Sequence, residues 1–200
     1  MAYRVRRKHG ISLLTLLIVA FIALGQSQGW FSKAGKGVMT SQPGLYTIAR
    51  YVDGDTIVVN MNGSTETVRF IGIDTPETHK PNTPVQCYGP AAAAHTQNTI
   101  KAAGGKVRLV SDSLSTNRDR YNRLLRYVYL PDGTNLNQLN VEQGYAFYYP
   151  FFPFSKKAEF AAAEQSAQTA HKGLWGNCTP TPVDGGGYKM EETQAQASGG

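Results

Sequence analysis

The distribution of apolar and polar positions predicts a chain whose strands come before most of its helices. Runs rich in β-branched and aromatic residues, each bounded by turn residues, predict strands at residues 46–52, 56–61, 66–73, 106–110 and 124–130. Asn62-Gly63, between the second and third runs, is typical of a two-residue hairpin. Segments with helix-favouring composition or helix stop residues predict helices at residues 90–103, 135–143 and 155–171.

The order of these elements indicates the fold class. Three strands are followed by a helix, two further strands and two further helices. Five short strands with a helix between the third and the fourth are typical of an OB-type barrel. We therefore predict an α+β fold dominated by β structure, a five-stranded OB-fold barrel with three helices.

The N-terminal segment has the pattern of an export or anchoring signal. Basic residues within positions 3–8 precede an apolar run at 11–25. As a helix that run would rise roughly 22 Å, less than the hydrocarbon core of about 30 Å. Small residues at Ala23-Leu24-Gly25 suit cleavage before Gln26. We expect residues 1–25 to be a cleaved signal peptide and the protein to be secreted or extracytoplasmic; an uncleaved membrane anchor at 11–25 and a buried helix are the alternatives.

Composition divides the rest of the chain into a linker, one folded domain and a tail. Residues 26–44 are rich in Gly, Ser, Gln and Lys, which predicts a linker. Residues 179–200 begin Thr-Pro-Thr-Pro, continue with three glycines and end in Gln, Ala, Ser and Gly, which predicts a disordered tail. We expect the folded domain between them, at residues 45–178.

Charge changes this picture only locally. The chain has 20 Lys and Arg against 14 Asp and Glu, but four of those basic residues lie in segment 1–25, and without them 16 remain against the 14. The overall charge is therefore weak support for a nucleic-acid partner. In residues 118–126, however, arginines surround Tyr121, and guanidinium groups beside aromatic rings suit a single-stranded nucleic acid. A solvated loop is the alternative.

The two cysteines, Cys87 and Cys178, both lie in the part of the chain that we expect outside the cytosol. A pair of cysteines in an oxidising compartment usually forms a disulfide, and we predict this one. Closing so long a loop would stabilise the fold by roughly 4–5 kcal/mol in the chain-entropy description. Two unrelated buried thiols are the alternative.

Two Cys and four scattered His also argue against a multi-ligand zinc site.

Three carboxylates and two arginines near strand ends could converge at one mouth of the barrel. They are Asp55, Asp74, Glu77, Arg69 and Arg123. Each alone is compatible with an ordinary turn, a polar loop or a structural ion pair. Their sum indicates one shared site rather than five unrelated features.

Arg69 raises a geometric problem within this group. It lies inside an otherwise apolar strand, so its guanidinium needs an anionic partner or a route to solvent. Asp74 is five residues further on, and strict alternation would put the two side chains on opposite faces. Both can face one site only if the strand bends, and we expect Gly72 to permit that bend.

The stretch from Tyr51 to Trp175 carries a family resemblance. Its motifs are Val52-Asp53-Gly54-Asp55-Thr56, Arg69-Phe70-Ile71-Gly72-Ile73-Asp74-Thr75-Pro76-Glu77, Tyr88-Gly89-Pro90, Asp119-Arg120-Tyr121-Asn122-Arg123 and Gly173-Leu174-Trp175. In this combination and order the chain resembles the thermonuclease, or staphylococcal-nuclease-like, family. The resemblance implies a five-stranded OB barrel with three helices. It also implies a calcium-dependent phosphodiesterase that hydrolyses DNA and RNA with little sequence preference and leaves 3′-phosphate ends.

The resemblance assigns a metal site and a base to particular residues. Asp55 and Asp74 match the family's metal-binding carboxylates. Thr75 matches a position that offers its backbone carbonyl to the metal. Glu77 matches the proposed general base. Hard carboxylate oxygens of this kind suit Ca²⁺.

The resemblance also assigns the contacts with substrate. Arg69 and Arg123 match the two phosphate-binding arginines, and Tyr121 matches a tyrosine near the bound nucleotide. Two positions depart from the family pattern: Asn122 stands where glycine is frequent, and Ala91 stands where the family usually has Glu. Asn tolerates a left-handed backbone, so the turn before Arg123 can be retained.

Partners and rival functions follow from the same residues. The resemblance implies single-stranded and double-stranded DNA and RNA as substrates; we expect a monomer without a protein partner, and contact with a membrane only if segment 1–25 stays attached. A first alternative is an OB barrel that holds single strands without cutting them. Family members that have become binding modules lose the carboxylates and arginines, which this chain keeps. A second alternative is an anchored surface protein that binds a protein or a glycan, which only the apolar N-terminus favours.

Overall fold

The computed structural model of the protein describes residues 41–78 and 84–190. The predicted signal or anchor at 1–25, the linker residues 26–40 and the tail residues 191–200 lie outside the described residues. Within the described part of the chain, no helix has both the length and the apolar character needed to cross a bilayer.

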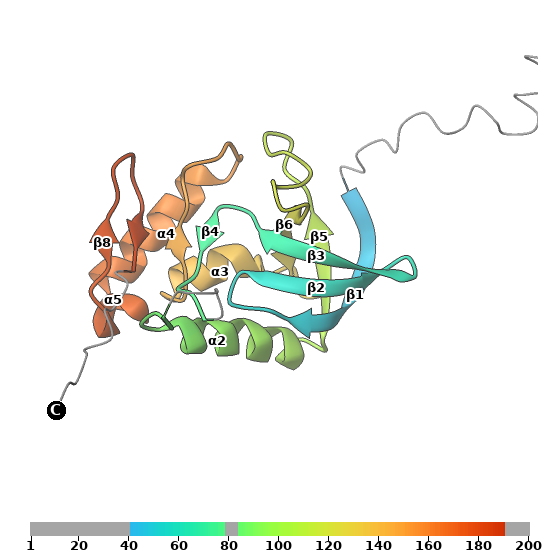
Figure 1. Ribbon diagram of the computed structural model, residues 1–200, viewed down its shortest axis with the longest axis horizontal. Helices are drawn as coiled ribbons and strands as arrows, with labels where there is room; N and C mark the ends of the chain where they lie inside the picture. The colour runs from blue at the N-terminus through green and yellow to red at the C-terminus, as the bar shows by residue number, and fades with distance from the viewer. Residues whose placement is uncertain (1–40, 79–83, 191–200) are drawn as a thin grey trace, which may run out of the picture. The chain divides into compact units, whose positions relative to one another are not determined.

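Five strands close into the barrel that the element order predicted (Figure 1). They are β1 (Ser41–Tyr51), β2 (Thr56–Met61), β3 (Ser64–Phe70), β5 (Lys106–Val110) and β6 (Leu124–Tyr129). Their order is β1-β2-β3-β6-β5, with β3 and β6 parallel and the other pairs antiparallel. β1 closes the barrel, because its first half pairs with β5 and its second half with β2. The predicted OB-type barrel is confirmed.

The β2–β3 hairpin turns through Asn62 and Gly63, as their sequence predicted. Their φ angles are 51° and 81°. Positive φ at both central residues is the requirement of a type I′ turn, whose twist matches that of the flanking strands. The turn brings Met61 opposite Ser64 and so sets the register of the whole hairpin.

Three helices pack against the barrel at the predicted places. They are α2 (Gly89–Ala102), α3 (Leu136–Glu142) and α4 (Lys157–Thr169). Pro90 fits the first turn of α2, where no intrahelical N–H bond is needed. Asn135 caps α3, because its side chain accepts a bond from the N–H of Asn137 at 3.1 Å. Buried residues such as Ile100 and Phe160 join the helices and the barrel in one hydrophobic core.

A pair of short strands beside the barrel was not predicted. β4 (Ile73–Asp74) pairs antiparallel with β7 (Phe147–Tyr148). Strands this short have too little periodicity to appear in a sequence pattern. The predicted strand 66–73 is therefore interrupted: β3 ends at Phe70, and the chain turns at Gly72 before β4 begins.

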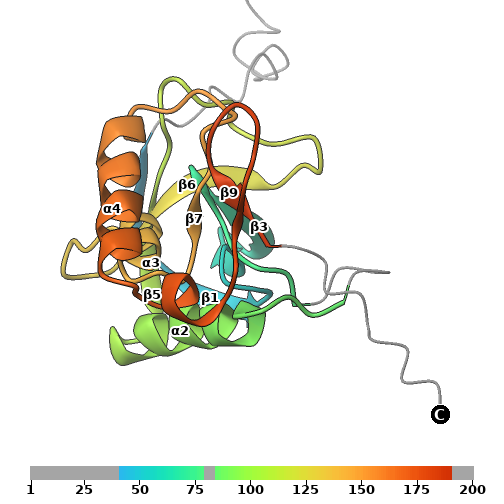
Figure 2. The same cartoon turned by 90° about the vertical axis from the view of Figure 1, so that its left-hand side faces the viewer.

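The structure differs from the predicted boundaries at both ends of the domain. β1 begins at Ser41, inside the predicted linker. After the short helix α5 (Leu174–Asn177), the chain forms a hairpin of β8 (Thr181–Pro182) and β9 (Tyr188–Lys189), where composition predicted a disordered tail from residue 179. Figure 2 shows β9 beside β7. The physical reason is that Tyr188 and Met190 pack with Phe147 and Leu174 in a second hydrophobic cluster.

Candidate active site

Arg69 connects two carboxylates at one end of the barrel. Its Nη1 pairs with Asp55 Oδ1, and its Nη2 donates to Asp74 Oδ1 at 2.6 Å and to the carbonyl of Ile73 at 3.1 Å. The guanidinium inside the apolar strand therefore has the anionic partners that its burial requires. The ion pair joins the two residues that the sequence assigns to a metal site.

The bend that this geometry needs occurs at Gly72. Its φ is +75°, a left-handed conformation that glycine adopts without strain. A Cβ at this position would also lie 2.6 Å from the ring of Phe154. The predicted bend is confirmed, because it returns Asp74 to the same guanidinium as Asp55.

Asp55 is almost completely buried, with 1% of its surface exposed. Besides Arg69, two neutral donors hold it: Thr56 Oγ1 donates to Oδ1 and the N–H of Thr75 donates to Oδ2, both at 2.9 Å. The backbone of Thr75 is thereby placed beside both carboxylates. The three predicted metal-binding residues, Asp55, Asp74 and Thr75, lie together.

The turn that carries Asp55 is held by a hydrogen bond within the turn and by hydrogen bonds from two helices. Asp53 Oδ1 accepts a bond from the N–H of Asp55 at 3.0 Å. Thr96 Oγ1 of α2 and Asn140 Nδ2 of α3 donate to the carbonyl of Gly54 at 2.7 Å and 3.2 Å. Two helices therefore position a turn that appears ordinary in the sequence.

Arg123 lies at the same end of the barrel as Arg69. It directly precedes β6, in which Leu125 pairs with Arg69 in the parallel ladder. Burial raises the pKa of the Asp53 carboxyl, and the positive charges of Arg69 and Arg123 both offset part of that rise. The two predicted phosphate-binding arginines are close enough to act on one carboxylate.

Asp119 shapes the loop that presents Arg123. Its Oδ2 accepts a bond from Arg123 Nε at 2.7 Å, and its Oδ1 accepts bonds from the N–H groups of Arg123 and Tyr121 at 2.9 Å and 3.0 Å. Burial opposes ionisation of Asp119, but these bonds and the Arg123 charge hold its pKa below the ordinary value. Asn122 adopts a φ of 65°, so the left-handed turn is retained without glycine. Tyr121 is 64% exposed, and the guanidinium groups of Arg120 and Arg123 lie 4.8 Å and 5.4 Å from its ring.

Two other arginines of the basic segment have internal partners instead. Arg118 forms a two-bond ion pair with Glu66, with both distances at 2.9 Å. Arg126 is buried and donates to the carbonyl and the side chain of Asn117. The local excess of positive charge in residues 118–126 is therefore partly neutralised or enclosed within the domain.

Glu77 lies just beyond β4, in a half-buried position. Its N–H donates to Gln86 Oε1 at 2.8 Å, and its carbonyl accepts a bond from the N–H of Gln86 at 2.9 Å. The neighbouring Cys87 forms the predicted disulfide with Cys178, with 6.1 Å between the Cα atoms. Nothing in the sequence pattern around Gln86 distinguishes it, and sequence reasoning missed it.

The donor set fits a hard cation such as Ca²⁺. Asp55, Asp74 and the carbonyl of Thr75 offer only oxygen atoms, and Ca²⁺ accepts irregular oxygen coordination completed by water. Two carboxylates around one guanidinium also leave net negative charge at the site. Across residues 41–78 and 84–190, no three His, Cys, Asp or Glu side chains gather in a metal-binding arrangement, so backbone oxygens and water would have to complete the coordination.

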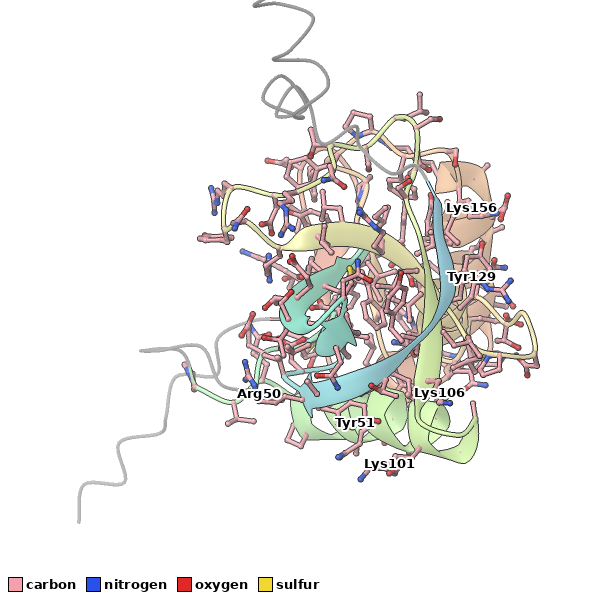
Figure 3. All side chains as sticks on the ribbon, turned by 90° about the vertical axis from the view of Figure 1, so that its right-hand side faces the viewer. Arg50, Tyr51, Lys101, Lys106, Tyr129 and Lys156 are labelled. Carbon is pink, nitrogen blue, oxygen red and sulfur yellow. A yellow bond between two sulfur atoms is a disulfide. The ribbon has the colours of Figure 1, made fainter. Side chains whose placement is uncertain are left out.

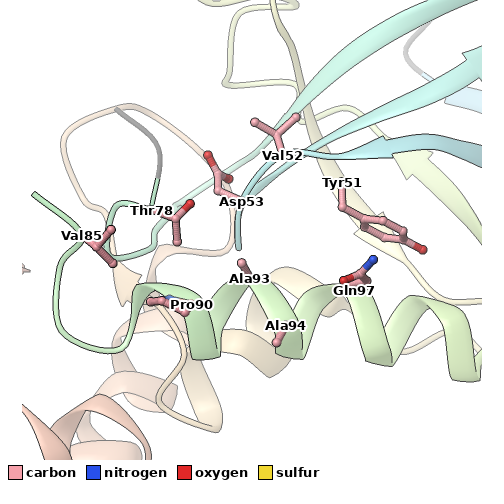
Figure 4. Close-up of a pocket in the computed structure, with 9 residues that line it drawn as sticks. All are labelled: Tyr51, Val52, Asp53, Thr78, Val85, Pro90, Ala93, Ala94 and Gln97. Atoms are coloured by element: carbon pink, nitrogen blue, oxygen red, sulfur yellow. The ribbon is translucent and has the colours of Figure 1, made fainter. Parts of the chain in front are cut away.

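A groove of about 470 Å³ adjoins this site. It lies between the Asp53 turn and α2, with Tyr51 and Gln97 at one end and Thr78 at the other (Figure 4). Asp53 lines the groove and also holds the backbone of Asp55. Asp53 is therefore the residue that links the wall of the groove to the turn that carries Asp55.

Arginines and carboxylates grouped at one end of an OB-type barrel are suited to bind a phosphodiester, and the similar proteins are nucleases by name. Residues 67–177 match the family described as Staphylococcal nuclease homologue. The chain is 37% identical to the Thermonuclease of Staphylococcus hyicus over 171 residues, which cover 84% of this chain and 95% of the relative. It is 36% identical to the Thermonuclease of Staphylococcus intermedius over 169 residues, which cover 83% and 95%. It is 40% identical to the SPbeta prophage-derived endonuclease YokF of Bacillus subtilis over 131 residues, which cover 64% of this chain and 43% of the relative. The chain therefore belongs to the staphylococcal nuclease homologue family, and the resemblance carried by its motifs is confirmed.

Proposed function

We propose that the protein is a calcium-dependent nuclease that hydrolyses DNA and RNA with little sequence specificity. Water attacks phosphorus and the bond between phosphorus and O5′ breaks, so the products carry 3′-phosphate and 5′-hydroxyl ends. The observation that supports this most is the Arg69 guanidinium held between Asp55 and Asp74, because it combines a phosphate-binding cation with oxygen ligands for a metal. The thermonuclease relatives support the nuclease activity itself.

Arg69 and Arg123 bind the scissile phosphate in this proposal. A guanidinium can donate two parallel bonds to phosphate oxygens, and such bonds strengthen as negative charge develops in the transition state. Each arginine is held by carboxylates, Arg69 by Asp55 and Asp74, and Arg123 by Asp119. Both donors are thus oriented before substrate arrives.

Glu77 is the proposed general base and accepts the proton of the attacking water. Asp55, Asp74 and the carbonyl of Thr75 would hold the metal. When bound, Ca²⁺ would neutralise charge on the phosphate and so favour the approach of the nucleophile.

The nucleic acid extends over the surface around this site. Tyr121 offers an exposed ring for stacking, with Arg120 beside it. Arg50, Lys101 and Lys106 are exposed cations on β1, α2 and β5 (Figure 3). The ammonium of Lys101 lies 5.8 Å from the centre of the Tyr51 ring, which lines the groove. These cations would attract the phosphate backbone in a salt-dependent way.

We also infer that segment 1–25 directs the protein out of the cytosol, as a cleaved signal or as an anchor through residues 11–25, and that the domain acts as a monomer. The disulfide supports an oxidising compartment, where such bonds persist.

The test is hydrolysis of single-stranded DNA and of RNA by the purified protein, with Ca²⁺ and with a chelator. Mass spectrometry of the products identifies their ends. We expect cutting of both polymers only with Ca²⁺, and 3′-phosphate products. Tight binding without cutting under any metal would favour the binding module instead.

A further inference from the structure

A single residue from another segment fixes the backbone of Glu77 on both sides. The N–H of Glu77 donates to Gln86 Oε1 at 2.8 Å, and the N–H of Gln86 donates to the Glu77 carbonyl at 2.9 Å. Such a reciprocal pair restrains rotation of the backbone from which the Glu77 side chain projects. It also gives partners to four polar groups, the N–H and carbonyl of Glu77 and the N–H and Oε1 of Gln86.

The segment that carries Gln86 is itself anchored to the start of α2. The N–H of Gly89 donates to the carbonyl of Gln86 at 3.0 Å. Gly89 approaches Glu77 so closely that a Cβ there would lie 2.6 Å from the Glu77 carbonyl oxygen. Hydrogen bonds therefore connect Gln86 both to Glu77 and to the first turn of the helix.

The disulfide connects this segment to the C-terminal part of the domain. Cys178 follows α5, and its N–H donates to the carbonyl of Leu174 at 2.9 Å. Leu174 is completely buried and packs with Phe147 of β7. β7 in turn pairs with β4, which contains Asp74. One C-terminal cluster therefore supports Asp74 through β7 and the Glu77 segment through the disulfide.

We propose that Gln86 is a positioning residue for Glu77, and that the Cys87–Cys178 disulfide fixes Gln86 in that role. The inference rests on the proposed function, in which Glu77 is the general base. A base must lie within hydrogen-bond reach of the water that it deprotonates, and a displacement of about 1 Å can lower a rate about 100-fold. Gln86 acts through the Glu77 backbone and needs no contact with substrate.

The first experiment separates positioning from binding. We expect Gln86→Ala to lower kcat by about 10-fold to 100-fold and to leave KM unchanged. Gln86→Glu retains an acceptor for the Glu77 N–H and should recover most of kcat. Gln165→Ala, at an exposed position of α4, is the matched control and should match the wild type. A wild-type kcat in Gln86→Ala, or a loss confined to KM, would overturn the proposal.

Glu77→Gln and amide hydrogen exchange distinguish this inference from the proposed function. If Glu77→Gln loses activity and Gln86→Ala does not, the positioning role fails and the nuclease site stands. If Glu77→Gln keeps the wild-type rate, Glu77 is not the base and both assignments fail.

Amide hydrogen exchange tests the bond itself. In Gln86→Ala we expect faster exchange of the Glu77 amide, with Gln86→Glu restoring protection. Unchanged exchange would contradict the bond on which the proposal depends.

A double-mutant cycle tests the disulfide. Three proteins are compared with the wild type: a variant without the disulfide (Cys87→Ser with Cys178→Ser), the Gln86→Ala variant, and a variant that combines all three changes. All are assayed at a temperature where circular dichroism shows that they are folded. We expect the cysteine change to lower kcat and the combination to lower it little further, because both act through one segment. Losses that add independently, or an unchanged kcat without the disulfide, would overturn this part of the proposal.

Discussion

Two buried carboxylates, Asp55 and Asp112, meet the same physical problem in different ways. They are 1% and 6% exposed, and burying either without partners would be costly. Asp112 accepts bonds from neutral donors, namely the Tyr127 hydroxyl, the N–H of Leu114 and both the N–H and the hydroxyl of Ser155. Asp55 has two neutral donors and a cation, Arg69.

In the proposed function, this difference separates a role in stability from a role in chemistry. The network around Asp112 is satisfied by hydroxyl and backbone groups of the fold itself, which is how buried polar groups stabilise a structure. Arg69 instead reaches past Asp55 to Asp74, whose side chain is 42% exposed. A charged cluster with an exposed member can exchange an internal partner for a phosphate or a metal.

The largest expected effect comes from changing the cation in this comparison. Arg69→Lys keeps the charge but loses the planar guanidinium that reaches two carboxylates and can clasp a phosphate. We expect kcat to fall by roughly 100-fold to 1,000-fold, measured on a DNA oligonucleotide. Arg108→Lys, at an exposed position of β5, is the control and should retain wild-type kcat. An Arg69→Lys enzyme with normal turnover would remove Arg69 from the catalytic site.

Glu164 of α4 sharpens the comparison, because it is a buried carboxyl with little hydrogen bonding. It accepts a bond from the N–H of Tyr148 at 2.9 Å. Burial raises its pKa from 4.5 to about 7, and this bond offsets only part of the rise. Since the folded state binds the proton more tightly, the stability that Glu164 contributes is complete below pH 4.5 and is lost as pH rises to about 7. From this rise in pKa we expect a loss of about 3 kcal/mol in the free energy of unfolding.

Urea unfolding between pH 4 and pH 8 measures this loss, with Glu164→Gln as the comparison. The variant cannot titrate at this position, so its stability should change less over the same range. A wild-type protein with constant stability there would contradict the raised pKa of Glu164.

Asp112 is expected to give the opposite pH dependence and a smaller effect. Burial alone would raise its pKa, but hydrogen bonds from Ser155, Tyr127 and Leu114 lower it from 3.8 to about 2. Its contribution is therefore complete above pH 3.8 and is lost as pH falls to about 2. We expect a loss of about 2 kcal/mol, measured by thermal unfolding in acid. Asp112→Asn should lack this acid transition, and its persistence would assign the transition to another group.

The smallest effect is expected at the edge of the site. Tyr121→Ala removes an exposed ring and should raise KM about fivefold for single-stranded DNA, with kcat little changed. Tyr121→Phe keeps the stacking surface and should behave like the wild type. A fall in kcat in both variants would show that the hydroxyl takes part in the reaction.

The barrel was predictable because its signals are local. Asn62-Gly63 fixes a hairpin through the two dihedral angles that it permits, and runs of β-branched residues flank it. The bend at Gly72 was also predictable from local sequence, because strand alternation would otherwise place Arg69 and Asp74 on opposite faces and glycine is the residue between them that bends most easily. The β8–β9 hairpin was not predictable, because glycines suggested disorder and only packing against Phe147 and Leu174 shows why Tyr188 is ordered.

In the candidate site, too, some residues were predictable from the sequence and others were not. Its carboxylates and arginines stand in recognisable motifs, and the structure groups Asp55, Asp74, Thr75, Arg69 and Arg123. The residues that hold them come from elsewhere in the chain. Thr96 and Asn140 bind the Gly54 carbonyl from two helices, and Gln86 binds Glu77 from another segment. Contacts of this kind depend on the folded arrangement, and the sequence spacing does not reveal them.

The most direct test of the distinction between the two carboxylate clusters compares Asp74→Asn with Asp112→Asn. Both variants are assayed for DNA hydrolysis at a temperature where they are folded, and both are unfolded in urea. We predict that Asp74→Asn lowers kcat/KM about 100-fold with little change in stability, and that Asp112→Asn lowers stability by about 2 kcal/mol with wild-type hydrolysis. Wild-type hydrolysis by Asp74→Asn, or an equal loss of hydrolysis in folded Asp112→Asn, would contradict the assignment of chemistry to the Arg69 cluster.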